Sequence, residues 1–410
     1  MRGMAAEANA DGSTDRWLTR GVAGIGGASL LSDLGHEIPT ALLPSFLTST
    51  LGAPAAALGL IEGIADGCAG AARFAGGALA DDPERRRQVA FGGYTATAVL
   101  SSAIGVAAAT WQVGVLRTAA WSARGLRVPA RNALLADIVP AAAYGRAYGF
   151  ERMMDNLGAI GGPLLALALV AIVGTRTAIL VSVVPGLLAA LAILYAIRAS
   201  VSHETRDRAP FRIQVRPVLR GRLAQLFVGI TAFEAGNVAA TLLILRATGL
   251  LTPAHGHDSA TEIALGLYIV YNVVATVASM VGGRLGDRRG SPLVLSMGVG
   301  CFAIAYGGFA LTSDSILVLA VAFGLAGVGI GFVETAENAA VAALAPVDAR
   351  GSAFGLLATV QSLGNFVASA IAGLIWTAVS PRAAFAYLVV FMVVALLAFA
   401  ATTLTSRDAT

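Results

Sequence analysis

The sequence of 410 residues contains no lysine, because all 28 of its basic residues are arginine. A phosphate-binding Walker A loop and catalysis through a lysine Schiff base both need a lysine side chain. This absence argues against a nucleotide-driven pump within the chain. Charged residues are also scarce, at 13%, while hydrophobic residues reach 57% and mean hydropathy is +0.76. So few charges cannot cover a soluble surface, and the composition predicts a polytopic, all-α membrane protein.

Twelve apolar segments are long enough to span a bilayer, which takes roughly 20 residues. The predicted spans are 21–47, 54–80, 88–109, 111–137, 146–173, 177–198, 223–248, 261–284, 292–312, 315–343, 352–378 and 382–404. A long polar stretch divides them six plus six. The predicted domains are an N-terminal cytoplasmic tail (1–20), an N-terminal six-helix bundle (21–198), a cytoplasmic linker (199–222), a C-terminal six-helix bundle (223–404) and a cytoplasmic tail (405–410).

The arginines are distributed very unevenly between the two ends of these spans. Nineteen fall on the side that contains the N-terminus, and three, Arg176, Arg246 and Arg382, fall on the other. Loops rich in arginine stay in the cytoplasm, so both termini are predicted to be cytoplasmic in a multi-pass protein of a bacterial inner membrane. The same asymmetry accounts for the sequence pI of about 9.4 without any nucleic-acid partner.

The two halves of the chain repeat at an offset of 206 residues. The segment 131–158 matches 337–364 without a gap, and ten of the 28 positions are identical, including the pair Asn132 and Asn338. Asp81 and Asp287 are related by the same offset. Parallel six-helix repeats indicate two bundles related by an axis along the membrane normal, with a substrate site between them near the midplane.

These features resemble the major facilitator superfamily across residues 17–405. The loop Gly77-x-Leu79-x-Asp81, followed by Arg85, is similar to the first signature of that family, and its repeat runs from Gly283 through Asp287 and Arg288 to Gly290. In the family, these loops contact neighbouring helix ends and help to switch between inward and outward states. The first copy departs from the pattern at residues 82–84, where Asp-Pro-Glu replaces the usual basic and glycine positions.

Two further segments resemble motifs inside the membrane. Arg117 stands at the position of the family's membrane arginine, although Trp121 and Ala123 replace the glycines that usually follow it. Gly158, Gly162 and Pro163 are similar to the fifth-helix signature of proton-coupled antiporters, in which Ala166-Leu167 replaces a final pair of glycines. The resemblance implies proton-coupled efflux by a major facilitator fold, and a Gly-Pro kink that only serves packing is the alternative.

Ionisable residues inside a bilayer are costly and are therefore functional candidates. In the N-terminal half the acidic candidates and one histidine lie on the first two spans, and the basic candidates lie on the fourth. They are Asp33, His36, Glu37, Glu62, Asp66, Arg117, Arg124 and Arg131. Helical spacing places His36 and Glu37 on the same face as Asp33. These groups either form a binding site or neutralise one another as purely structural ion pairs.

The central charges of the C-terminal half are all acidic: Glu234, Glu334 and Glu337. No arginine lies in the middle of any predicted span there, and Glu337 replaces Arg131 across the repeat. These acids therefore pair across the interface with an arginine such as Arg124 or Arg131, bind a cation, or are protonated through burial. We expect at least one of them to carry a coupling proton.

The segment 32–37 together with 59–67 resembles a bacterial subgroup that includes permeases associated with nickel resistance. His36 and Glu37 would be the metal-binding candidates for such a substrate, although four histidines in the whole chain weaken that alternative. The leading prediction is a secondary transporter, not an enzyme, that exchanges protons for a small solute, acts as a monomer in the bilayer and needs no cofactor. Proton symport for uptake, a receptor and a lipid-modifying enzyme are the competing interpretations.

Overall fold

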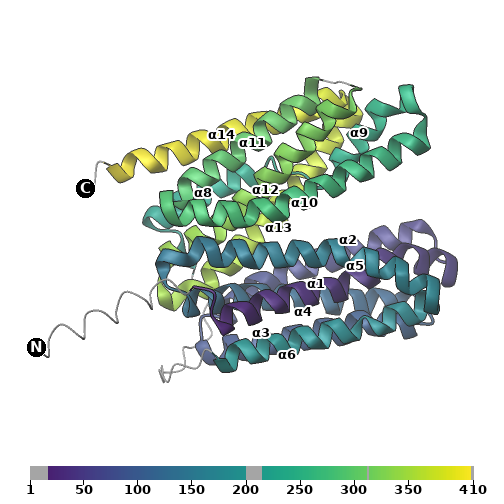
Figure 1. Ribbon diagram of the computed structural model, residues 1–410, viewed down its shortest axis with the longest axis horizontal. Helices are drawn as coiled ribbons and strands as arrows, with labels where there is room; N and C mark the ends of the chain where they lie inside the picture. The colour runs from purple at the N-terminus through teal and green to yellow at the C-terminus, as the bar shows by residue number, and fades with distance from the viewer. Residues whose placement is uncertain (1–16, 200–214, 312–313, 408–410) are drawn as a thin grey trace, which may run out of the picture.

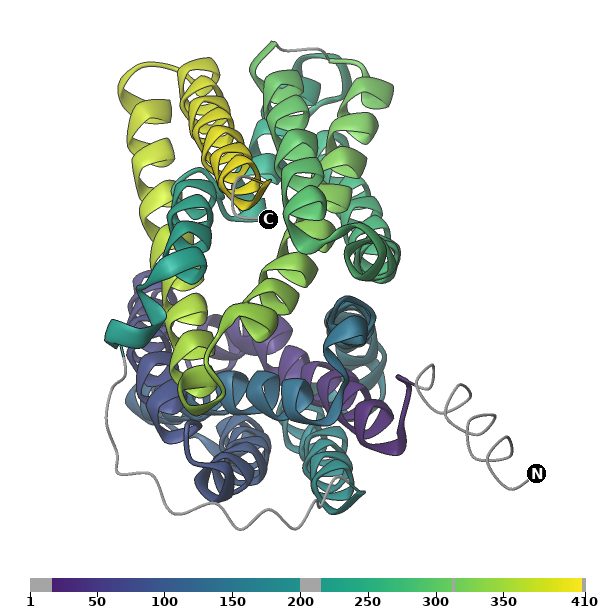
Figure 2. The same cartoon turned by 90° about the vertical axis from the view of Figure 1, so that its left-hand side faces the viewer.

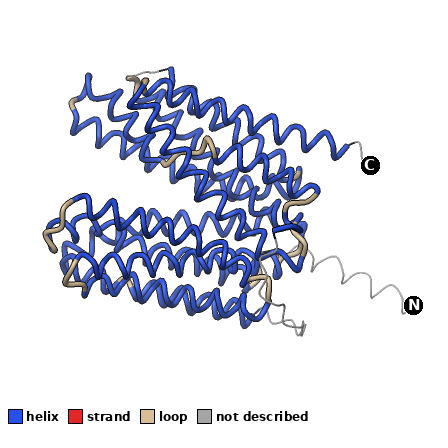
Figure 3. Tube along the Cα trace, turned by 180° about the vertical axis from the view of Figure 1, so that it is seen from behind, coloured by secondary structure: helices blue, strands red, loops and turns tan. Residues whose placement is uncertain are grey.

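The protein folds into twelve membrane-spanning helices arranged as two six-helix bundles, as predicted. The computed structural model describes residues 17–199, 215–311 and 314–407, and these residues contain no β-strand (Figures 1 and 3). The predicted tail 1–20 and linker 199–222 lie mostly outside the described residues, apart from the short helix α7 (Val215–Val218) and the starts of neighbouring helices.

The N-terminal bundle contains α1 to α6. Their bounds are α1 Arg20–Ser45, continued by a π-helical turn Phe46–Thr50, α2 Ala55–Leu79, α3 Pro83–Ala103, α4 Thr110–Ile138, α5 Tyr144–Val181 and α6 Val183–Ala199. The predicted fifth and sixth spans meet inside α5, where Gly174 has a φ of 75° and joins two helices across a sharp turn. The sixth span is interrupted at Ser182, because Pro185 has no N–H to continue the helical ladder.

The C-terminal bundle contains α8 to α14, of which α8 and α9 together form one span. Their bounds are α8 Gly221–Glu234, α9 Ala240–His255, α10 His257–Arg289, α11 Ser291–Leu311, α12 Ile316–Leu344, α13 Arg350–Ala378 and α14 Pro381–Arg407. Figure 2 shows this bundle stacked on the N-terminal bundle, with the helices of each packed around one another.

The predicted span 223–248 is not one helix, because the backbone leaves helical geometry between Glu234 and Ala240. Polar side chains of α13 bind the backbone groups that this break releases. Asn365 donates from Nδ2 to the carbonyl of Asn237 at 2.9 Å, and the N–H of Ala239 donates to Ser369 Oγ at 2.9 Å. Non-helical backbone at membrane depth is tolerated only where the protein satisfies it in this way.

Seven helical segments among the described residues are long and apolar enough to cross a membrane, and one of them, Ala141–Ala199, covers the predicted fifth and sixth spans together. The spans formed by α1, α2 and α4, and the span divided between α8 and α9, do not meet that criterion. Within the N-terminal bundle the exceptions are α1, α2 and α4. These three helices carry most of the charged residues that the sequence places inside the N-terminal bundle. Polar side chains are therefore concentrated on the helices that line the bundle interior and the bundle interface.

The two bundles touch at the end of the molecule where α2 passes into α3, which we call the termini end, and diverge toward the opposite end (Figure 1). Two helix crossings bring the backbones together there. A Cβ added at Gly145 would lie 2.2 Å from the carbonyl oxygen of Gly283, and one at Gly351 would lie 2.5 Å from that of Gly77. These positions are related by the 206-residue repeat, so glycine at all four permits two equivalent close contacts.

Candidate functional site

Arg117 on α4 is buried in a cage of polar and aromatic groups near the middle of the N-terminal bundle. Its guanidinium donates to Glu62 Oε2 and to Thr40 Oγ1, each at 3.0 Å, and its Cζ lies 3.2 Å from the ring centroid of Trp121. The tryptophan that replaces a family glycine is therefore a cation–π partner of the arginine. Asp66, one turn after Glu62, is exposed and takes no part in this contact.

Asp33, His36 and Glu37 lie together on α1, as predicted. The imidazole Nδ1 of His36 lies 2.8 Å from the carbonyl oxygen of Ser32 and 3.4 Å from Asp33 Oδ1, and Nε2 lies 3.3 Å from Glu37 Oε1. Arg124 of α4 approaches Asp33 to 3.6 Å. The described residues nevertheless include no group of three or more His, Cys, Asp or Glu arranged to hold a metal ion.

Gly158 and Gly162 of α5 pack directly behind these acids. A Cβ at Gly158 would lie 2.8 Å from the Cβ of Asp33, and one at Gly162 would lie 2.4 Å from the Cβ of Glu37. Pro163 follows, and the backbone around it stays helical. The antiporter-like glycines thus set the distance between α5 and the acidic face of α1.

Toward the termini end, Arg131 binds two acids that the sequence analysis did not select. Its NH1 lies 2.7 Å from Glu151 and 3.5 Å from Asp155, both on α5, and Ser29 joins the cluster by hydrogen bonds to Arg131 and Glu151. The neighbouring Arg127 donates to Ser32 and lies over the ring of Tyr94. Ion pairing inside the bundle therefore accounts for Arg131.

An ion pair in the membrane interior joins the two bundles: Arg152 of α5 binds Glu334 of α12 as well as Asp155. Pairing with an arginine such as Arg124 or Arg131 was one of the alternatives predicted for the C-terminal acids, and for Glu334 the partner is Arg152. Arg152 was missed because it lies near the start of its predicted span, where an arginine is normally assigned to the membrane surface. Its partner Glu334 is thereby neutralised across the interface.

Glu234 and Glu337 form no ion pair among the described residues, and both are almost completely buried, with 3% and 0% of their surface exposed. Glu337 accepts a hydrogen bond from Gln361 Nε2 at 2.8 Å, while its other oxygen has no partner in the described part of the chain. Glu234 accepts one from Asn237 Nδ2 at 3.0 Å and packs against Gly364. The two carboxyl groups therefore flank one turn of α13, supported only by neutral amides.

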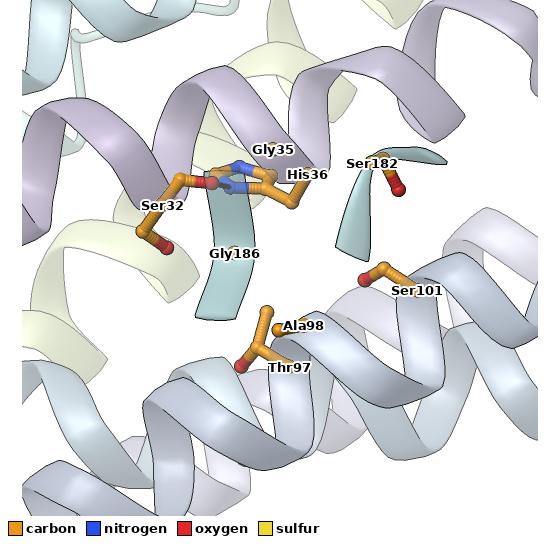
Figure 4. A pocket seen from close by; sticks show the side chains of 8 residues that line it. All are labelled: Ser32, Gly35, His36, Thr97, Ala98, Ser101, Ser182 and Gly186. Carbon is orange, nitrogen blue, oxygen red and sulfur yellow. Dashed lines mark hydrogen bonds between the residues drawn. The ribbon is translucent and has the colours of Figure 1, made fainter. Parts of the chain in front are cut away.

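A small pocket lies behind α1, between α1, α3 and the start of α6 (Figure 4). The ring of His36 and the hydroxyl groups of Ser32, Thr97, Ser101 and Ser182 line it. Ser101 Oγ has no hydrogen-bond partner among the described residues, while His36 Nε2 has Glu37 as its neighbour. The pocket therefore offers the Ser101 hydroxyl group to a small polar molecule such as water.

At the termini end, each signature aspartate caps a helix of the other bundle. Asp287 accepts hydrogen bonds from the backbone N–H groups of Gly145 and Arg146 at 2.6 and 3.0 Å, and from Arg146 Nε at 2.8 Å. Asp81 accepts from the N–H of Ser352 at 2.8 Å and from its hydroxyl group. Burial raises the pKa of Asp81, and its bonds to Ser352 oppose that shift.

The arginines of these loops differ in their contacts. Among the described residues the guanidinium of Arg85 pairs with its neighbour Asp82 at 3.9 Å, and Arg288 is exposed. The adjacent Arg86 is buried and binds Asp137 at the end of α4, which also receives Arg350 from the C-terminal bundle. Which of three consecutive arginines turns inward depends on the rotation of α3 at its start, and the sequence pattern alone does not specify it.

Comparison with known proteins agrees with this architecture. The family model of the Major Facilitator Superfamily matches residues 25–252 and 239–409, and the chain belongs to that family. An uncharacterised transporter of the superfamily from Methanocaldococcus jannaschii is 28% identical over 378 residues, which are 91% of this chain and 92% of the relative. The protein is thus a multi-pass membrane transporter of the superfamily.

Two further similarities concern a named solute and a solved structure. A gentisate transporter from Corynebacterium glutamicum is 27% identical over 282 residues, which cover 65% of this chain and 61% of that protein. A bacterial homologue of the iron transporter ferroportin, solved in an outward-facing state, superimposes with a TM-score of 0.74 at 17% identity, covering 94% of this chain and 100% of that one. The structural likeness shows the fold alone.

Proposed function

We propose that this transporter exports a small solute in exchange for protons, by exposing a site between its bundles alternately to the two sides of a bacterial inner membrane. The observation that supports the proposal most directly is the complete burial of the Glu337 carboxyl group without an ion-pair partner among the described residues. An ionised carboxylate that is fully buried beside a neutral amide is costly, so the group takes up a proton instead. A transporter that must gain and lose a proton in each cycle needs such a group near the bundle interface.

The proposal includes the orientation indicated by the arginines, with the tails and the linker 199–222 in the cytoplasm. In that orientation the termini end is the cytoplasmic end, and the structure is closed there by Arg152–Glu334 and by the aspartate caps. The bundles diverge toward the outside (Figure 1). The structure is then an outward-facing state, in which Glu337 carries its proton before the cytoplasmic end opens. The protein acts as a monomer surrounded by lipid.

The buried acids Asp33 and Asp155 of the N-terminal bundle are compensated by arginines. Arg124 lies 3.6 Å from Asp33, and Arg131 and Arg152 lie 3.5 and 3.0 Å from Asp155. Glu337 has no such compensation, and we therefore assign it the coupling role.

The relative's name favours an organic anion as the solute, since gentisate is a carboxylate. Nickel export has no support from the geometry, because no metal-holding group is found in the described part of the chain. Uptake by symport would use the same protonation site and differs only in the relative direction of the proton and the solute.

Reconstitution into proteoliposomes containing a pH-sensitive dye tests the proposal. A panel of carboxylates, their neutral amides, sugars and divalent cations is added outside, and the luminal pH is followed. Export by antiport predicts that an added solute moving in drives protons out, so the luminal pH rises. Acidification of the lumen by the same solute would show symport, and no proton movement with any solute that is transported would contradict proton coupling.

A further inference from the structure

One face of α10 is exposed from Val273 to the last turn of the helix. Val273, Val277 and Val281 are 48%, 60% and 48% exposed, and Arg284 and Arg288 are exposed farther along. These five residues recur every three or four positions, so their side chains lie on one face of the helix. The face therefore changes from apolar to basic as it approaches the termini end.

The opposite face of α10 is packed against other helices of the protein. A Cβ at Gly283 would lie 2.2 Å from the carbonyl oxygen of Gly145 on α5, and one at Gly331 of α12 would lie 2.9 Å from the backbone nitrogen of Ser279. These close backbone contacts fix which face of α10 is turned inward. The three valines and the two arginines therefore face away from the protein, toward the surrounding lipid.

The uncharged stretch of α10 matches the thickness of a bilayer. Residues 263–283 contain no charged side chain, and Glu262 and Arg284 stand at the two ends of this stretch. Its 21 residues form a helix about 31 Å long, and the hydrocarbon core of a bilayer is about 30 Å thick. The three valines are then at the depth of the acyl chains, while Arg284 and Arg288 are at the depth of the lipid headgroups.

These two arginines have no counter-charge within the protein. Neither Arg284 nor Arg288 forms a hydrogen bond or an ion pair with another described residue. The acid of the same turn, Asp287, is bound to Gly145 and Arg146 of α5. Arg284 and Arg288 are four residues apart on one helix face, where like charges repel each other. The negative end of the helix dipole favours arginine at this position, but it leaves the N–H groups of both side chains free to bind an anion.

We propose that this face of α10 binds an anionic phospholipid, with the phosphate at Arg284 and Arg288 and an acyl chain along the three valines. A guanidinium presents parallel N–H groups that match two oxygens of a phosphate. A lipid with a net negative charge removes the repulsion between the two arginines, whereas the cationic group of a zwitterionic lipid is itself repelled by them. The bound headgroup holds the same turn of α10 whose Asp287 caps α5.

Native mass spectrometry of the full-length protein in a mild detergent tests this site. The probes are phosphatidylglycerol and phosphatidylcholine with the same acyl chains, and glycerol phosphate is added as a competitor that lacks them. One double variant combines Arg284→Gln with Arg288→Gln. The matched control combines Arg220→Gln with Arg222→Gln, which removes two exposed arginines next to the start of α8. Thermal unfolding of each variant confirms that it is folded.

We expect the first phosphatidylglycerol molecule to bind about 10-fold or more tightly than phosphatidylcholine, since two arginines at the membrane surface attract it. The double variant at Arg284 and Arg288 should lose most of this preference, the control should keep it, and glycerol phosphate should not compete. Equal binding of the two lipids, or a preference that persists in the folded double variant, would overturn the proposal. An equal loss in the control would show general attraction to basic residues instead of a site on α10. Displacement by glycerol phosphate would show that the valines take no part, and would refute the lipid site.

Discussion

Asn132 and Asn338, which occupy the same position in the two halves of the chain, form a hydrogen bond with each other across the bundle interface. Asn132 Nδ2 donates to Asn338 Oδ1 at 2.8 Å. Two equivalent residues can meet only on the pseudo-twofold axis, so this contact marks where the axis crosses the interface. Asn338 also donates from its own Nδ2 to the carbonyl of Glu334, which binds Arg152. The hydrogen bond on the axis is therefore linked through Glu334 to the ion pair between the bundles.

This position predicts that Asn132→Ala destabilises the closed termini end by about 1 kcal/mol, since one buried hydrogen bond is lost. The measurement is the distance between spin labels at Arg20 and Arg289, two exposed positions at the termini end of different bundles. The variant should show a larger fraction of long distances than the unsubstituted protein. Asn132→Asp serves as the second variant, because it places a negative charge next to Asn338. An unchanged distribution in both would show that the axial contact does not hold the end closed.

The two aspartate caps are equivalent by sequence but not by charge. The helix capped by Asp287 presents Arg146, whereas the helix capped by Asp81 presents Ser352 at the matching position. We therefore predict that Asp287→Asn opens the termini end more than Asp81→Asn does, by about 1–3 kcal/mol, because it removes a charge-assisted bond. The same spin-label distances measure the difference.

The contribution of the Asp81 cap to closure should change with pH in the opposite direction to that of a carboxylate held in a simple salt bridge. Its pKa is raised in the closed interface, so the contribution of this cap is fully present below the ordinary carboxyl pKa and is reduced as pH rises through the raised value. Closure should therefore weaken as pH rises through this range, and Asp81→Asn should remove that part of the pH dependence. A pH profile that is identical with and without Asp81 would contradict this assignment.

The ion pair between Arg152 and Glu334 should act as one unit. Arg152→Gln and Glu334→Gln are each expected to weaken closure by about 1–3 kcal/mol, and the double variant should be no worse than either single one. The effect is smaller than for a fully buried pair, since 20% and 27% of the two side chains remain exposed. A double-mutant cycle on the spin-label distances checks this, and additive effects would show that the two residues act separately.

The orientation of the protein in the membrane is tested separately by cysteine labelling. In a background with Cys68→Ser and Cys301→Ser, a cysteine at the exposed Thr50 should react with an impermeant maleimide added to intact cells. A cysteine at Arg289 should react only after the membrane is opened, because the termini end is expected to face the cytoplasm. The reverse pattern would invert the transport direction that we propose.

The repeat and the charge pattern predicted a large part of this arrangement. The offset of 206 residues matched Asp81 with Asp287 and Asn132 with Asn338, and these pairs occupy equivalent places in the two halves of the structure. The sequence also placed Glu337 and Glu234 in a region without arginine. These predictions depend on which helix a residue occupies, and hydropathy determines that well.

The residues that were missed depend on how each helix is rotated and where it bends. Glu151, Arg152 and Asp155 lie close to one end of α5, and their partners Arg131 and Glu334 come from α4 and α12. The rotation of α5 that turns these residues toward both partners is set by tertiary packing. The break between α8 and α9 was also unexpected, because it depends on the polar partners that α13 supplies.

The most direct test of the account is the behaviour of Glu337→Gln in proteoliposomes. Glutamine keeps the size and the hydrogen bond to Gln361 but cannot release a proton. The carboxylate that binds best to the unsubstituted protein is used in two assays: uptake driven by a pH gradient, and exchange of labelled for unlabelled solute without a gradient. The account predicts that the variant loses gradient-driven transport and keeps exchange. Full pH-driven transport by Glu337→Gln would contradict the assignment of the coupling proton to this residue.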